Sequence, residues 1–183
     1  RRDRHTGRLL DYARGRSAED QNAWPAAAGH YRLASRHHRH LDHRTGEADY
    51  AADLPVRRRY AIALAAAFKQ KWATAATVLG SLDPDHRDVR QRLAYIRARR
   101  AEQHTDVDAA IAIYEELPPD HEDVARRLAE HKVRRAELKG DWAALIESID
   151  ALPAGCDNHG PLRLYANARQ HQESGHWAAA AAL

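Results

Sequence analysis

A tandem repeat with a period of 35 residues runs through this chain of 183 residues. The hexapeptide Pro-Asp-His-Arg-Asp-Val at 84–89 recurs as Pro-Asp-His-Glu-Asp-Val at 119–124. The same 35-residue frame places a large apolar residue at four positions, namely Trp72, Val107, Trp142 and Trp177. A fixed period of this size is typical of stacked supersecondary units, because one such unit cannot bury its apolar face alone.

Within each period the apolar residues have helical spacing. Val89, Leu93 and Ile96 lie on one face of a predicted helix that runs to about Gln103, and a second helix begins near Asp106. The pair Pro118-Pro119 ends the second helix, because proline cannot donate to the helical hydrogen-bond ladder. Each period is therefore predicted to be one helical hairpin.

We predict an all-α solenoid of about five helix-turn-helix repeats. A divergent hairpin with a histidine-rich insertion occupies 1–53, and the regular repeats are 54–88, 89–123, 124–158 and a truncated 159–183. Trp24 and Trp72 are 48 residues apart, which is 13 more than the period, so we place the surplus in the insertion and expect the helix to restart near Pro55.

Composition adds limits on the class of protein. The formal charge is +3, with 29 basic and 26 acidic residues, which indicates a mixed surface and not a strongly basic one. The single cysteine, Cys156, suits a reducing cytoplasm, and no apolar run is long enough to cross a membrane. Because the chain contains no methionine, we expect it to be a fragment of a longer cytoplasmic polypeptide.

The repeat resembles the tetratricopeptide repeat. The run Gly140-Asp141-Trp142, followed by Leu145-Ile146 and Ile149, is similar to the second-helix pattern of that family. The chain departs from the pattern at Ala94 and Ala129, where the family has a large aromatic residue, and in its period, which is about 34 residues in the family. The resemblance implies a right-handed superhelix whose first helices line a concave groove for a peptide or a partner helix.

In that frame, one stripe of side chains on the first helices would face the groove. Stacked repeats would align arginines beside tyrosines, and guanidinium groups bind carboxylates well. We therefore predict a groove for a peptide segment, acidic in its chemistry; the alternative is that these residues form solvated intrahelical ion pairs. The predicted groove residues are Arg57, Tyr60, Arg92, Tyr95, Arg99, Arg127, Glu130, Arg134, Tyr165 and Arg169.

Other conspicuous residues are given structural or solvated roles. We assign Trp72, Trp142 and Trp177 to the core because they recur in an inward-facing slot. The histidine cluster of the insertion is predicted to be solvated and not a metal site; it comprises His37, His38, His40 and His43. Cys156 lies three residues before His159, but no third group orients the pair. No catalytic or cofactor-binding motif is present, so we predict no enzyme activity and no cofactor.

Two classes of function follow. The first is a non-catalytic protein-interaction or scaffolding module of a larger regulatory protein. The second is a nucleic-acid-binding array, because pentatricopeptide repeats also have 35 residues and read single-stranded RNA; against it, Glu130 stands among the candidate readout positions and Glu102 and Glu137 would repel phosphates. A third option is self-association through an apolar helix face left uncapped at the C-terminal end.

Overall fold

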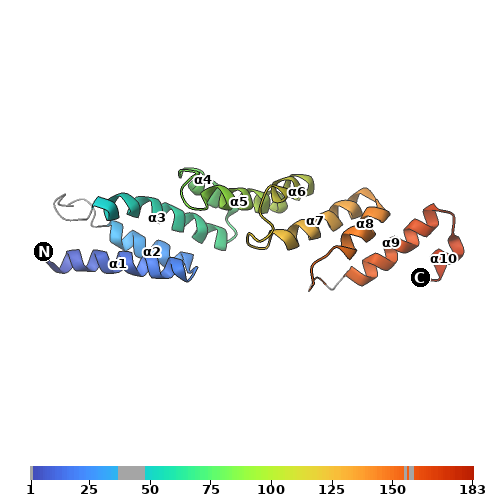
Figure 1. Ribbon diagram of the computed structural model, residues 1–183, viewed down its shortest axis with the longest axis horizontal. Helices are drawn as coiled ribbons and strands as arrows, with labels where there is room; N and C mark the ends of the chain where they lie inside the picture. Colours follow the sequence, from blue (N-terminus) through green and yellow to red (C-terminus); the bar gives the residue numbers. More distant parts are fainter. Residues whose placement is uncertain (1, 37–47, 155, 157–158) are drawn as a thin grey trace. The chain divides into compact units, whose positions relative to one another are not determined.

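The computed structural model describes residues 2–36, 48–154, 156 and 159–183, and this part of the chain is all-helical, with no strand (Figure 1). The helices are α1 (Arg2–Asp20), α2 (Trp24–Ser35), α3 (Ala48–Phe68), α4 (Trp72–Leu79), α5 (Val89–Gln103), α6 (Val107–Glu115), α7 (Val124–Lys139), α8 (Trp142–Asp150), α9 (Gly160–Glu173) and α10 (Trp177–Ala181). The all-α prediction is confirmed. The His37–His43 cluster lies outside the described residues, so the prediction about it stays a prediction.

The chain divides into two compact units, residues 1–96 and 97–183, with the boundary inside α5. In the first unit α1 packs on α2, α2 on α3 and α3 on α4 (Figure 1). In the second unit α6 packs on α7, α7 on α8, α8 on α9 and α9 on α10. Sequential packing of this kind gives each unit a core that is built from neighbouring helices along the chain.

Five hairpin corners share one backbone geometry. At each corner a residue with positive φ follows the first helix, and the next amide donates to the carbonyl five positions earlier, as in Asp141 N to Ala136 O at 3.1 Å. This is the Schellman arrangement, which satisfies the last carbonyls of a helix. The corner residues are Asn22, Gln70, Thr105, Gly140 and Gly175.

The cores contain the predicted apolar faces. In the first unit one cluster gathers α3, α4 and α5 around Tyr60, Leu79 and Ile96, and a second gathers α1, α2 and α3 around Tyr31 and Leu54. In the second unit Leu145 is fully buried in a cluster that α7, α8 and α9 share. Burial of one such leucine stabilises a fold by roughly 1.5–3 kcal/mol.

Helix α3 differs from the prediction. It begins at Ala48 and continues through Pro55, so the expected restart near Pro55 was wrong. A proline within a helix removes one backbone hydrogen bond and crowds the preceding turn. Leu54, which is 1% exposed, and Tyr60, which is 2% exposed, anchor the same helix in the core, and their burial offsets that cost.

Candidate functional site

An aspartate recurs four residues before each of three predicted groove arginines. Asp88 Oδ2 accepts from Arg92 Nε at 2.9 Å, and Asp123 Oδ1 accepts from Arg127 Nε at 2.8 Å. The third pair is Asp53 with Arg57. The exposed fraction of the side chain is only 12% for Arg57, 21% for Arg92 and 18% for Arg127. Their guanidinium groups are therefore already paired with carboxylates of this chain.

Tyrosines of the preceding first helix complete two of these pairs. The Tyr12 hydroxyl donates to Asp53 Oδ2 at 2.5 Å, and the Tyr60 hydroxyl donates to Asp88 Oδ1. Burial alone would raise the pKa of Asp53, but hydrogen bonds from Tyr12 and Arg57 lower it below its usual value. Burial and the bond to Asp88 raise the pKa of Tyr60. Tyr60 lies in the core and not on an accessible groove surface.

Glu19 is a buried charge at the centre of the first unit. Its side chain is 5% exposed, and its Oε2 atom accepts from Arg57 Nη1 at 2.8 Å and from Arg87 Nη2 at 3.0 Å. Arg87 has a φ of 53° and also lies over the Tyr60 ring, 5.3 Å from its centroid. A carboxylate buried with two guanidinium groups holds α1, α3 and the loop before α5 in one arrangement.

Glu102 has the same role in the second unit. It accepts from the Tyr114 hydroxyl at 2.7 Å and from Arg127 Nη1 at 3.1 Å, and it contacts His131 Nε2 at 2.8 Å. The Arg99 Nε atom lies 2.8 Å away. Burial alone would raise the pKa of Glu102. Hydrogen bonds from His131 and Tyr114, together with the charges of both arginines, instead lower it to about 2. Helices α5, α6 and α7 meet at this carboxylate.

A tryptophan at the start of a second helix contacts the tyrosine of the next first helix. The Trp24 and Tyr60 ring centroids are 5.7 Å apart at an interplanar angle of 72°, and those of Trp142 and Tyr165 are 5.6 Å apart at 88°. Both are edge-on contacts of the kind that aromatic quadrupoles favour. Trp72, 8% exposed, lies in the core as predicted. We name this contact the tryptophan clamp.

The clamp on Trp142 has three components from α9. Besides the Tyr165 ring, Arg169 lies over the indole at 5.3 Å, and Trp142 Nε1 donates to Glu173 Oε1 at 2.7 Å. Arg169 also donates to Gln172 at 3.1 Å. Two of the predicted groove residues, Tyr165 and Arg169, thus hold one helical hairpin on the next.

The predicted groove stripe therefore contains two groups of side chains, those held in contacts within the chain and those that stay largely exposed. Most of its members are engaged in the contacts above or, like Tyr95, are half-buried. Arg134 is different, because its side chain is 58% exposed and pairs with Glu137, at 2.9 Å on the same helix. Glu130 pairs with Arg126 at 2.7 Å. Tyr165 keeps 53% of its surface exposed despite its contact with Trp142.

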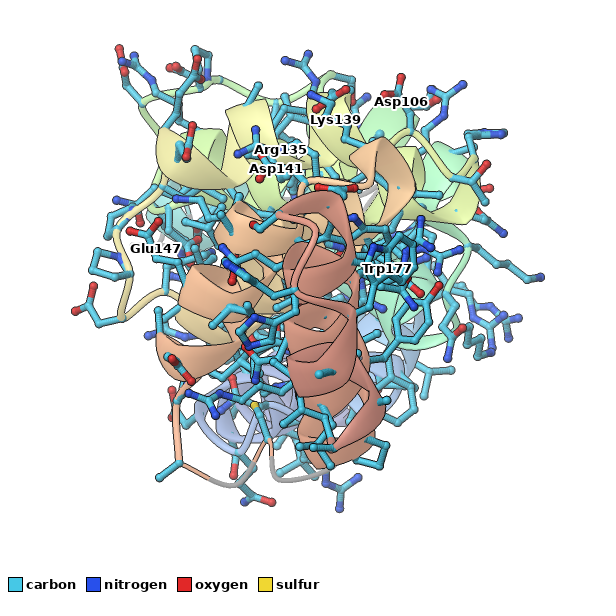
Figure 2. The ribbon with its side chains drawn as sticks, turned by 90° about the vertical axis from the view of Figure 1, so that its right-hand side faces the viewer. Asp106, Arg135, Lys139, Asp141, Glu147 and Trp177 are labelled. Carbon is cyan, nitrogen blue, oxygen red and sulfur yellow. The ribbon has the colours of Figure 1, made fainter. Side chains whose placement is uncertain are left out.

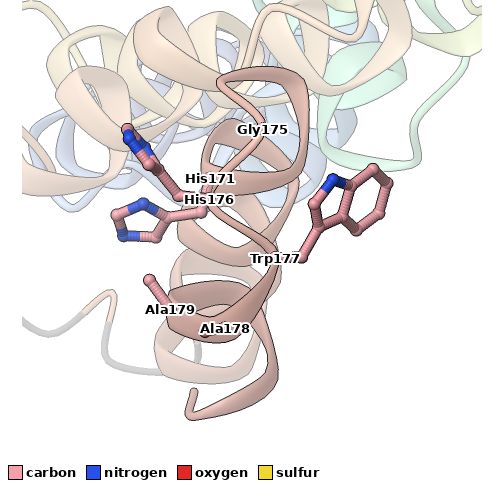
Figure 3. Close-up of a pocket in the computed structure, with 6 residues that line it drawn as sticks. All are labelled: His171, Gly175, His176, Trp177, Ala178 and Ala179. Atoms are coloured by element: carbon pink, nitrogen blue, oxygen red, sulfur yellow. The ribbon is translucent and has the colours of Figure 1, made fainter.

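Trp177, which is labelled in Figure 2, was predicted to be a core residue, and this was wrong because it is 66% exposed. Trp24 and Trp142 show the physical reason, since each is covered by a side chain of the following helix, and no described side chain does this for Trp177. A hollow of about 490 Å³ lies beside it, lined also by His171 and His176 (Figure 3). The centroids of these two imidazoles are 6.2 Å apart.

Within the described residues, no group of three or more His, Cys, Asp or Glu side chains has the arrangement of a metal site. Cys156 and His159 both line a hollow formed with the apolar residues Ile149, Leu152 and Pro153. None of the described helices is long and apolar enough to cross a membrane. Comparison with protein-family models, with curated proteins and with solved structures gave no match to this chain.

The sequence held a signal for the engaged arginines. Asp53, Asp88 and Asp123 recur in the 35-residue frame, each four residues before an arginine, which is the spacing of helical ion pairs. The tryptophan clamp also has a sequence signature, because Trp142 precedes Tyr165 by 23 residues and Trp24 precedes Tyr60 by that interval plus the 13-residue surplus.

Proposed function

We propose that this chain is a tetratricopeptide-like α-solenoid with a 35-residue period, and that it acts as a non-catalytic scaffold that binds a partner polypeptide. The observation that carries the proposal is the recurrence of the same contacts in one frame: corner, aspartate–arginine pair and tryptophan clamp. Contacts that repeat along a chain stabilise a stack of hairpins. Stacks of this kind have an extended surface that can bind partners.

The partner surface of this proposal is centred on α7. Arg134 and Leu138 are one helical turn apart and are 58% and 62% exposed, the first for its side chain and the second for the whole residue. Arginine is enriched in interface hot spots, and an exposed leucine beside it offers apolar surface that a partner can bury. We propose that a partner carboxylate replaces Glu137 at Arg134 while an apolar partner side chain covers Leu138.

Fluorescence anisotropy with three labelled amphipathic helical peptides tests this surface. The peptides share one apolar face and carry glutamate, lysine or glutamine on the other. We expect the glutamate peptide to bind most tightly and the double variant Arg134→Glu, Leu138→Ala to lose at least about 10-fold in affinity. The control is Arg59→Glu, which makes the same charge change at an exposed position of α3. Equal losses in the two variants would contradict the proposed surface.

The same assay addresses nucleic acid. Phosphate contacts dominate RNA affinity at low salt, so a labelled poly-uridine strand at about 50 mM salt is the most permissive probe. We expect no saturable binding, because the arginines at Arg57, Arg92 and Arg127 are paired with aspartates. Tight, salt-dependent binding of this strand would favour the nucleic-acid alternative over a polypeptide partner.

A further inference from the structure

The clamp on Trp142 defines which helix face covers a tryptophan in this protein. The residues of α9 that cover it are Tyr165, Arg169 and Glu173, spaced four apart so that they lie along one stripe. Ala166, on the same side of α9, is fully buried in the shared core. The covering face therefore consists of a tyrosine and the alanine after it, an arginine four residues after the tyrosine, and a carboxylate four residues after the arginine.

Trp177 has the same place at the start of α10 that Trp142 has at the start of α8. Its indole is 66% exposed and points away from His171 and His176 (Figure 3). The alanines that follow it, Ala178 and Ala179, are exposed as well. An exposed indole with small neighbours is an incomplete copy of the clamp.

Helix α1 carries the covering face without a tryptophan. When α1 and α9 are aligned on their tyrosines, α1 has a similar residue at each position that the clamp uses and at the leucine three residues before the tyrosine. The corresponding residues are Leu9 and Leu162, Tyr12 and Tyr165, Ala13 and Ala166, Arg16 and Arg169, and Asp20 and Glu173. Ala13 and Asp20 are exposed, Leu9 is 42% exposed and the Arg16 side chain is 46% exposed. By contrast, Ala166 is fully buried and Leu162 packs against the core.

Tyr12 packs on Tyr31 within its own unit, with ring centroids 5.8 Å apart, and its hydroxyl is engaged as well. It donates to Asp53, just as Tyr60 donates to Asp88. The Tyr60 and Trp24 rings meet edge to face at the same time. A hydrogen bond from the hydroxyl is thus compatible with an indole on the ring.

We propose that Trp177 of one copy docks on α1 of a second copy and completes the clamp there. The Tyr12 and Trp177 rings meet edge to face, Arg16 lies over the indole, and Asp20 accepts the indole N–H. The contact is heterologous, because the donor and acceptor surfaces are different parts of the chain, so association proceeds head to tail. This self-recognition goes beyond the proposed binding of a partner on α7 and uses different residues.

Sedimentation velocity from about 1 μM to about 1 mM tests this contact, since weak and moderate association both become visible in that range. We expect the average mass of the unmodified chain to rise with concentration. Trp177→Ala should weaken association at least about 30-fold, as truncation of a hot-spot tryptophan does. Ala13→Arg, which places a large side chain on the acceptor face, should have the same effect.

Mixing the two variants gives the sharper result. The Ala13→Arg chain retains Trp177 and the Trp177→Ala chain retains α1, so the mixture should form a one-to-one dimer that grows no further. Phe68→Ala is the matched control, because Phe68 is 73% exposed on α3 and lies outside both surfaces. A monomeric wild type at about 1 mM, an unchanged Trp177→Ala variant or a mixture that stays monomeric would each overturn the proposal.

Discussion

Replacing Glu102 by glutamine should cost the second unit about 3 kcal/mol at neutral pH. The fall in the pKa of Glu102 from its ordinary 4.5 to about 2 corresponds to about 3 kcal/mol in favour of the ionised form in the folded state. The side chain is 14% exposed, so solvent screens these contacts little. Glutamine preserves the shape and one acceptor oxygen but leaves Arg99 and Arg127 without their shared negative charge.

The effect has a definite pH dependence. Because the folded-state pKa is lower than the unfolded one, the ionised carboxylate stabilises the fold fully above about pH 5 and progressively less as the pH falls towards 2. Glutamine does not titrate, so the difference between Glu102→Gln and the wild type should be largest at pH 7 and should shrink by most of its value at about pH 2.5.

Urea unfolding monitored by circular dichroism at the two pH values measures both quantities. Glu137→Gln is the control, since Glu137 pairs with Arg134 on the surface, with side chains 39% and 58% exposed, and such pairs contribute about 0–1 kcal/mol. The reasoning would be refuted if the two variants lost equal stability at pH 7, or if the Glu102→Gln deficit were the same at both pH values.

The same unfolding assay tests four backbone predictions. Gly15→Ala should destabilise by about 1–3 kcal/mol, because the added Cβ would lie 2.5 Å from the Tyr31 ring, whereas Gly29→Ala, with no atom within 4 Å, should stabilise its helix by about 0.5–1 kcal/mol. Gly140→Ala should cost about 1 kcal/mol, because φ is +66° at that corner. Thr105→Gly should be neutral or stabilising by up to about 1 kcal/mol, since a β-branched residue there has a φ of 58°; destabilisation at Thr105 would contradict a shared corner geometry.

The helices were largely predictable because apolar spacing and prolines mark them. α5 ends at Gln103 as expected, and Gly140 is at the corner that its lack of a side chain favours. Corners at Gln70 and Thr105 were not evident from residue type, because neither residue favours a positive φ. Here the hydrogen bonds of the Schellman turn and the packing of two helices determine the backbone and override local preference.

The candidate site was less predictable, because residue spacing predicts which side chains share one face of a helix but not which other side chains cover that face. Arg57 and Arg92 lie on the predicted stripe, yet aspartates one turn earlier pair with them. Tyr60 was placed on the groove side and is buried instead, because Trp24 covers its ring. Trp177 follows the frame in sequence but lacks a covering helix among the described residues.

The central claim is that one recurring contact, the tryptophan clamp, holds one hairpin on the next at two places in the chain, between α2 and α3 and between α8 and α9. Double-mutant cycles with leucine replacements at Trp142 and Tyr165, and separately at Trp24 and Tyr60, measure the coupling free energy of the two clamps. We expect a favourable coupling of about 0.5–1.5 kcal/mol in each cycle, of similar size in both. A coupling near zero in either cycle would contradict the account, because the contact would then recur in the structure without stabilising the stack.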